Sequence, residues 1–123
     1  MDENKGKILA GIDIFSIPRM KLAKKNFIER VFTKDEITNS TIEGLAKIFS
    51  VKEAFFKCIG IEPKWKEIEV SNCDQKSFGG DKSPVIEIRP ALEEEFGLKG
   101  CGIEISISSD GKNVISSVII IRN

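Results

Sequence analysis

Apolar and polar positions divide the chain into segments with strand-like and helix-like spacing. Residues 8–14 form a nearly continuous apolar run broken by one aspartate, which is typical of a strand that is buried on both faces. Residues 103–108 alternate between isoleucine and a polar residue, which indicates a half-buried strand. Asp110 and Gly111 then predict a tight turn, so residues 114–121 should return as the partner strand of a hairpin.

The longest helical pattern covers residues 41–59. Apolar side chains occupy most sides of this helix, so we expect it to be central and buried. Glu53 falls on its main apolar stripe, four residues after Phe49 and three before Phe56. A buried carboxylate is costly unless it is paired or ligates a cation. Glu53 is therefore either neutralised by a neighbour such as Lys57, one turn further on, or it holds a metal.

Shorter elements surround the long helix. A proline is predicted to open a basic helix, and a Thr-x-x-Glu capping box to open a second short helix. The resulting order, β-α-α-α-β-β-α-β-β, predicts a single α+β domain over residues 1–123, with a mainly antiparallel sheet packed on the long central helix. The remaining predicted elements are a helix from Pro18 through Lys25, a short helix from Thr33, a strand over 65–70, a loop over 71–84, a strand over 85–88 and a helix from Pro90 to Gly97.

Composition excludes several classes of function. Lys and Arg balance Asp and Glu at 19 each in 123 residues, so we expect neither general nucleic-acid binding nor membrane binding. The chain has no histidine, which excludes histidine-based acid–base or nucleophilic catalysis and disfavours structural zinc. Three cysteines without a CxxC pair indicate a reducing compartment, and acidic residues precede the first apolar run, so we expect a cytoplasmic protein.

Two acidic residues stand in apolar surroundings, Asp13 on the first strand and Glu53 on the long helix. A pair of carboxylates without histidine or cysteine suits Mg²⁺, which usually completes its shell with water and substrate phosphates. Lys57 would then neutralise a phosphate. The alternatives are structural: Asp13 as the cap of a neighbouring turn, and Glu53 as the partner of Lys57.

The order of motifs resembles that of the 4'-phosphopantetheinyl transferases, in particular their short, single-domain holo-[acyl-carrier-protein] synthase branch. The resemblance covers nearly the whole chain, from about residue 8 to residue 121, and the two acidic motifs at this separation are its most specific part. The motifs are Gly-Ile-Asp-Ile at 11–14 with Arg19 behind it, residues 27–37, Phe-Ser-Val-Lys-Glu-Ala-Phe-Phe-Lys at 49–57, residues 65–70 and Ile-Ser-Ile-Ser at 105–108.

This resemblance implies a specific reaction. The family moves the phosphopantetheine arm of coenzyme A onto a serine of an apo carrier protein and releases adenosine 3',5'-bisphosphate. Asp13 and Glu53 match the Mg²⁺ ligands, and Lys57 matches the lysine at the phosphates, so Glu53 and Lys57 are the expected catalytic residues. Lys52 matches a nucleotide or fold contact. The expected coenzyme A contacts are Lys52, Lys57, Ser108 and Ser109, although serines on a strand are by themselves ordinary.

The resemblance also implies two kinds of protein partner. Arg19 matches a position that contacts the acidic recognition helix of the acyl carrier protein, and Lys21, Lys24 and Lys25 would widen that basic surface. The alternative is a solvated helix face without a partner. The short members of the family are trimers with active sites between subunits, so a homotrimer is expected here.

Three family features are absent. The histidine that usually follows Ser-Ile-Ser is Ser109, the arginine before the phenylalanine of the Lys-Glu-Ala motif is Ile48, and the Gly-Thr-Gly loop is replaced by residues 59–64. Because these positions help to hold coenzyme A and its phosphates, we expect weaker cofactor binding. They also motivate an alternative function, a non-catalytic family member that binds a carrier protein without modifying it.

Overall fold

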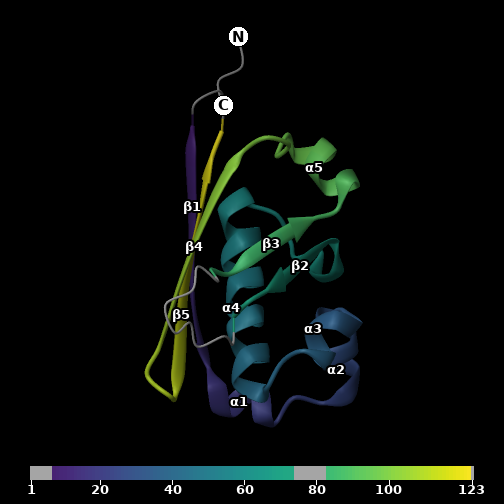
Figure 1. The fold of residues 1–123 in the computed structure, drawn as a ribbon, viewed down its shortest axis with the longest axis vertical. Helices are drawn as coiled ribbons and strands as arrows, with labels where there is room; N and C mark the ends of the chain where they lie inside the picture. Colours follow the sequence, from purple (N-terminus) through teal and green to yellow (C-terminus); the bar gives the residue numbers. More distant parts are fainter. Residues whose placement is uncertain (1–6, 74–82, 123) are drawn as a thin grey trace.

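The computed structural model describes residues 7–73 and 83–122, and it arranges them around one long helix (Figure 1). An antiparallel sheet of order β1-β5-β4 lies against one side of α4. A separate two-stranded antiparallel sheet, β2-β3, contacts α4 through β2. The prediction of an α+β fold is confirmed, but the strands form two sheets and not one. The elements are β1 (Ile8–Ser16), α1 (Ile17–Lys21), α2 (Lys25–Val31), α3 (Lys34–Thr38), α4 (Ile42–Ile59), the 3₁₀ turn η1 (Trp65–Glu67), β2 (Ile68–Ser71), β3 (Val85–Ile88), α5 (Pro90–Phe96), β4 (Gly102–Ser109) and β5 (Asn113–Ile121).

Helix α4 has the predicted extent and the predicted burial. The Thr41 side chain accepts a hydrogen bond from the Gly44 amide at 3.0 Å, which satisfies one free donor of the first turn. Gly60 ends the helix in the left-handed conformation, with φ 75°. Most of its side chains between these caps are buried, and none of the described helices is long and apolar enough to cross a membrane.

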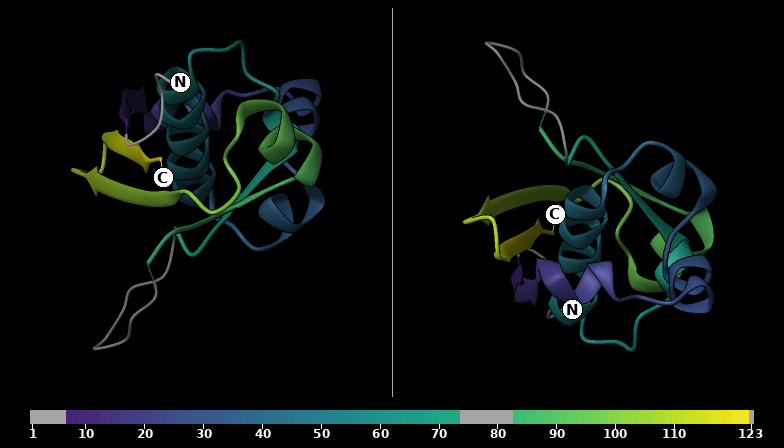
Figure 2. Two further views of the ribbon diagram at one scale, coloured as in Figure 1. Left: turned by 90° about the horizontal axis from the view of Figure 1, so that it is seen from above. Right: turned by 90° about the horizontal axis from the view of Figure 1, so that it is seen from below.

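Strand β1 is buried on one face only, so the prediction of burial on both faces is wrong. Ile8, Ile12 and Ile14 are each 65% exposed, whereas the alternate residues face α4. The outward isoleucines of β5, which pair beside them, are also exposed. Figure 2 shows α4 along one face of this sheet and no described element over the other. The apolar run of β1 would be buried on both faces only if another molecule covered this second face of the sheet. We call it the outer face, formed by Ile8, Ile12, Ile14, Ile115, Ile119 and Ile121.

The basic segment after Pro18 forms two short helices, although the sequence predicted one. The Leu22 and Ala23 amides bond back three residues, to the carbonyls of Arg19 and Met20, which tightens and ends α1. Lys24 is extended and precedes α2. The capping box at Thr33 is confirmed: Glu36 N–H donates to Thr33 Oγ1 at 3.2 Å, and Thr33 N–H donates to Glu36 Oε1 at 2.8 Å.

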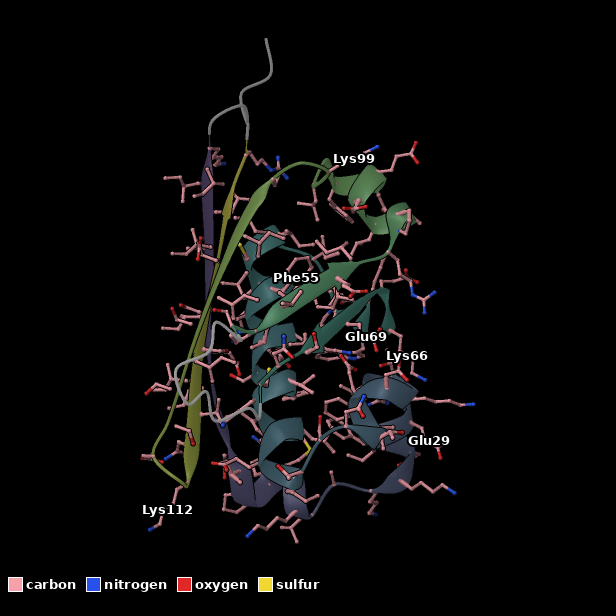
Figure 3. The ribbon with its side chains drawn as sticks, viewed as in Figure 1. Glu29, Phe55, Lys66, Glu69, Lys99 and Lys112 are labelled. Atoms are coloured by element: carbon pink, nitrogen blue, oxygen red, sulfur yellow. The ribbon has the colours of Figure 1, made fainter. Side chains whose placement is uncertain are left out.

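The second half of the chain largely follows its predicted elements. Residues 65–67 form η1 and not the start of a strand, and Trp65 stacks on Phe49 with ring centroids 5.3 Å apart. Most of the loop predicted over 71–84 lies outside the described residues. The hairpin of β4 and β5 is confirmed, and Asp110 Oδ1 accepts from the Lys112 and Asn113 amides in its turn, which lowers the pKa of Asp110. Lys112 marks the tip of this hairpin in Figure 3.

Candidate active site

A glycine sets the distance between β1 and α4. A Cβ atom at Gly11 would overlap the Ala54 carbonyl oxygen and lie 2.7 Å from the Cys58 amide nitrogen. Only a residue without a side chain allows the strand to lie this close to the helix backbone. Asp13, two residues later on the same face of β1, is therefore held against the last turns of α4.

Asp13 meets Lys57 at this contact. Lys57 Nζ donates to Asp13 Oδ1 at 3.0 Å and lies 3.5 Å from the Ile12 carbonyl oxygen. The predicted alternative, an ion pair between Lys57 and Glu53 within the helix, is not the one that forms. Asp13 Oδ2 is buried and has no hydrogen-bond partner among the described residues. A buried carboxylate oxygen without a partner is a costly arrangement that a bound cation would relieve.

Glu53 is partly buried beside this pair. Burial raises the pKa of Glu53, the negative charge of Asp13 raises it further, and the charge of Lys57 partly opposes both. The net direction is upward, because the attraction of Lys57 does not offset burial and the repulsion between the two carboxylates. Asp13, Glu53 and Lys57 thus form one charged cluster, which we call the carboxylate–lysine cluster.

The cluster fits a magnesium ion by its donor chemistry. It offers carboxylate oxygens from two rigid elements, one of them buried and without a partner. Across residues 7–73 and 83–122, no three His, Cys, Asp or Glu side chains gather closely enough to hold a metal without other ligands. The protein would supply two ligands, and water and phosphate oxygens would complete the shell, as Mg²⁺ prefers. Zinc, which favours three or four protein ligands, does not fit.

A buried hydroxyl pair that was not predicted lies next to the cluster. Ser50 Oγ and Ser116 Oγ are 2.7 Å apart, and both residues are buried. Ser116 is the cross-strand partner of Asp13 on β5, and Ser50 lies one turn before Glu53 on α4. The pair thus joins α4 to β5 directly beside the two carboxylates. Its only sequence signal is the three-residue spacing from Ser50 to Glu53.

Lys52 belongs to the interior and not to this cluster. Its ammonium group donates to Glu36 Oε1 at 2.7 Å, to the Val31 carbonyl at 2.8 Å and to the Trp65 carbonyl at 2.9 Å. Its side chain is 0% exposed, and burial lowers the pKa of Lys52 while the Glu36 carboxylate opposes that shift. Since all three donors are used inside the protein, the predicted coenzyme A contact is corrected to a fold contact.

Two hollows lie near the carboxylate–lysine cluster. One, of about 380 Å³, is lined by Asp13 and Lys57 together with isoleucines of the outer face. The other, of about 300 Å³, has an aromatic wall of Phe15, Phe27 and Phe49. Phe15 follows Asp13 on the same face of β1, and Phe49 precedes Glu53 by one helical turn. The first hollow therefore includes part of the cluster, and the aromatic hollow is built on the same two elements, β1 and α4.

Two of the four predicted basic residues, Arg19 and Lys24, line the aromatic hollow. Arg19 is exposed, and its guanidinium lies 5.4 Å from the centre of the Phe15 ring. Lys21 is exposed on α1, and Lys25 pairs at 3.8 Å with Glu29 at the surface of α2. The structure thus gathers Arg19 and Lys24 at one hollow, with the other two lysines on the helices beside it.

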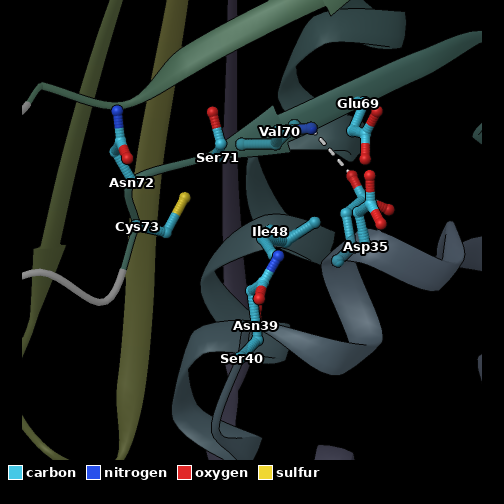
Figure 4. A pocket seen from close by; sticks show the side chains of 10 residues that line it. Asp35, Asn39, Ser40, Ile48, Glu69, Val70, Ser71, Asn72 and Cys73 are labelled. Carbon is cyan, nitrogen blue, oxygen red and sulfur yellow. Dashed lines mark hydrogen bonds between the residues drawn. The ribbon is translucent and has the colours of Figure 1, made fainter.

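The remaining predicted contacts lie elsewhere on this chain. Ser108 and Ser109 are exposed at the end of β4, and Ser109 Oγ donates to Glu43 Oε1 at 3.3 Å. Ile48 borders a separate cavity of about 340 Å³, shown in Figure 4, whose charged lining residues are all acidic: Asp35, Glu36 and Glu69. These carboxylates would repel a phosphate, so this cavity is not the candidate active site.

A family model described as the 4'-phosphopantetheinyl transferase superfamily matches residues 10–97, which include the whole carboxylate–lysine cluster. The chain belongs to this superfamily. Among curated relatives of this transferase chain, the holo-[acyl-carrier-protein] synthase of Campylobacter hominis is 30% identical over 91% of the chain and 96% of the relative. The synthase of Clostridium tetani is 36% identical over 89% of the chain and 92% of the relative.

Solved structures agree with this assignment. The transferase chain superposes on Helicobacter pylori holo-[acyl-carrier-protein] synthase in complex with coenzyme A with a TM-score of 0.74 and 27% identity, over 91% of the chain and 99% of that structure. The apo synthase named for Chronobacterium ammoiniagenes gives a TM-score of 0.73 at 22% identity, over 94% of the chain and 97% of that structure, which supports the fold alone. The predicted family and fold are both confirmed.

Proposed function

We propose that this transferase moves the 4'-phosphopantetheine arm of coenzyme A to a serine hydroxyl of an apo acyl carrier protein, with Mg²⁺, and releases adenosine 3',5'-bisphosphate. The observation that carries the proposal is the carboxylate–lysine cluster, with its buried and unpartnered Asp13 Oδ2. The names of the curated relatives supply the carrier protein as acceptor, and the Helicobacter pylori complex supplies coenzyme A as donor.

Each residue of the cluster has a role that its position supports. Asp13 and Glu53 would hold the ion, which supplies positive charge to the pyrophosphate of coenzyme A. Lys57 is more than half exposed on a flexible stem, so it can reach a phosphate oxygen next to the carboxylates. The serine oxygen forms a bond to the phosphorus that bears the pantetheine arm, the bond from that phosphorus to the nucleotide phosphate breaks, and the serine proton is released.

The acceptor would approach from the aromatic hollow. Arg19 and Lys24 at its rim suit an acidic helix, and the rings of Phe15, Phe27 and Phe49 suit an apolar side chain of that helix. Phe15 and Phe49 lie close to the cluster along β1 and α4. A carrier-protein helix seated in this hollow would therefore bring the acceptor serine of the carrier protein toward Asp13 and Glu53. Lys21 and Lys25 would add to the steering of an acidic partner.

A homotrimer is part of the same proposal. The outer face exposes six isoleucines, among them Ile12, Ile14 and Ile115, which also line the hollow at Asp13. A contiguous apolar face of this kind is unusual for a monomer and favours association. A second copy seated there would border the carboxylate–lysine cluster, so coenzyme A would bind between subunits.

The second candidate function is carrier-protein binding without transfer. It is favoured by the contact of Ser109 with Glu43, which places an acidic group where the family has a histidine. This contact would weaken the hold on a phosphate. In this case the chain would keep the basic aromatic hollow but would not turn over.

Mass spectrometry of an apo carrier protein separates the two functions. Incubation with the chain, coenzyme A and Mg²⁺ should add one phosphopantetheine arm, and EDTA should prevent the addition. Asp13→Ala and Glu53→Ala should abolish transfer in chains that remain folded by circular dichroism. Transfer by both variants would contradict the metal assignment, and carrier binding without any mass gain would favour the non-catalytic function.

A further inference from the structure

The carboxylate–lysine cluster already contains a cation of its own. Lys57 Nζ donates to Asp13 Oδ1 at 3.0 Å, so one oxygen of the carboxylate that would hold a metal is already paired with a cation, while Oδ2 of the same carboxylate is buried without a partner. We infer that Lys57 acts as a stand-in for the metal: it neutralises Asp13 in the free chain and has to leave when Mg²⁺ binds. This inference rests on the proposed metal site.

The charges require such an exchange. A divalent cation bound between Asp13 and Glu53 would share the Asp13 carboxylate with the Lys57 ammonium, and two positive charges on one carboxylate repel each other in a partly buried site. Lys57 therefore lowers the affinity of the free chain for metal. It also prevents Asp13 and Glu53 from standing as two unneutralised carboxylates when no metal is bound.

The two partners differ in their freedom to move. The Lys57 side chain is 55% exposed and has a flexible four-carbon stem, whereas the Asp13 side chain is 10% exposed and fixed on β1. An ion pair with one exposed partner contributes little stability, so releasing it costs little. Lys57 can swing away while Asp13 keeps its position for the metal.

Coenzyme A would provide the new partner for the released lysine. Its pyrophosphate is an anion that Lys57 can reach from the same helical turn, so binding of the cofactor would draw Lys57 away from Asp13. Metal and cofactor would then each raise the affinity for the other, by the same factor. Lys57 thus keeps the affinity of the chain for the metal low until coenzyme A binds.

Titration with Mn²⁺, followed by the electron paramagnetic resonance signal of the free ion, tests this directly without any turnover. Lys57→Met should bind Mn²⁺ about tenfold more tightly than the unaltered chain in the absence of coenzyme A. Lys99→Met is the matched control, because it removes the same charge from an exposed lysine beside α5 (Figure 3). It should change the affinity by less than about twofold.

The outcomes separate this inference from the proposed function. Equal Mn²⁺ affinity in Lys57→Met and the unaltered chain, or equal tightening by Lys57→Met and Lys99→Met, would overturn the inference and leave the metal site intact. Mn²⁺ binding that is unaffected by Asp13→Asn, with or without coenzyme A, would instead show that the proposed metal site itself is wrong.

Discussion

Gly11 of β1 and Ala54 of α4 approach so closely that no Cβ atom fits between them. This contact brings Asp13 to the last turns of the helix, where Lys57 and Glu53 project. The short distance is therefore a condition for the carboxylate–lysine cluster as well as for packing. Gly11 therefore allows the backbones of β1 and α4 to approach, and this approach positions Asp13 two residues later.

Gly11→Ala should weaken both the fold and the activity. The new methyl group has to push β1 away from α4, and overpacking of this kind costs about 1–3 kcal/mol. We expect the melting temperature to fall by about 5–15 °C and transfer by the folded fraction to fall at least about tenfold, because Asp13 is displaced. Thermal denaturation and the carrier-protein assay measure the two effects.

Gly102→Ala is the matched control for this substitution. A Cβ atom at Gly102 would lie 3.7 Å from Ile121 Cβ, an ordinary contact, so stability should change by less than about 0.5 kcal/mol. Similar melting temperatures for Gly11→Ala and Gly102→Ala would show that β1 has room to relax and that the close approach of β1 to α4 does not require Gly11.

Glu53→Gln should stabilise the metal-free chain while it removes activity. Burial and the Asp13 charge raise the pKa of Glu53 above its value in the unfolded chain, so protonation favours folding. That contribution is fully present below the unfolded pKa and is lost as the pH rises through the folded pKa. In EDTA, the variant should melt higher than the unaltered chain at pH 7, by about 3 °C or less because Glu53 is partly exposed.

The same melting temperatures at pH 4 provide the control for Glu53→Gln. Glu53 is largely protonated in the folded chain there, so the variant and the unaltered chain should differ little. A lower melting temperature for the variant at pH 7 would mean that the attraction of Lys57 outweighs burial, contrary to a raised pKa of Glu53.

The sequence was sufficient to predict most elements and the two acidic residues, because each depends on a local signal. The spacing of α4, its Thr41 and Gly60 ends, and the capping box at Thr33 are all set within a few residues. Glu53 stood out because a carboxylate interrupts an apolar stripe. Signals of this kind do not depend on how distant segments meet.

The contacts that the sequence did not predict join distant segments. Lys57 bonds to Asp13 across 44 residues, and Lys52 bonds to Glu36 across 16, so neither partner is visible in the spacing of one helix. A lysine has several acidic residues within reach along its own helix, and only the register of β1 on α4 decides among them. The exposure of Ile12 was not predicted, because an apolar strand can be buried by another molecule as well as by its own chain.

Lys52→Met should unfold or strongly destabilise the chain. The substitution leaves the Glu36 carboxylate buried without its ion pair and removes donors from the Val31 and Trp65 carbonyls. Breaking a buried pair by removing one partner typically costs about 3–5 kcal/mol. Urea denaturation measures the loss. In the double variant with Glu36→Gln, the loss should be smaller than the sum of the two single losses.

Coenzyme A binding distinguishes the two roles that the sequence allowed for Lys52. A stable Lys52→Met chain that binds coenzyme A poorly would make Lys52 a cofactor contact, against the fold contact seen here. Conversely, a destabilised variant that retains its affinity for coenzyme A below its melting temperature would support the interior role.

Ser109→His should strengthen the use of coenzyme A. Glu43 Oε1 lies 3.3 Å from Ser109 Oγ, so an imidazole at this position has a carboxylate beside it that favours its charged form. A cation at the end of β4 would then attract a phosphate group. We expect the KM for coenzyme A to fall several-fold, with little change in kcat.

Ser109→Asn is the control for the added charge. It adds a side chain of similar polarity that stays neutral, so the KM for coenzyme A should stay close to that of the unaltered chain. An equal fall in KM for both variants would mean that size and not charge matters at this position. An unchanged KM in Ser109→His would place the cofactor phosphates away from the end of β4.

Ile12→Glu on the outer face should disrupt the proposed trimer and abolish transfer. Ile12 is 65% exposed in one chain and lines the hollow at Asp13, so a charge there would be buried without a partner in a trimer. Ile42→Glu, at an exposed position on α4 outside this face, should keep both the trimer and the activity. Sedimentation velocity gives the oligomeric state. A fully active monomer would show that the cluster needs no second copy, and that the apolar outer face serves another contact.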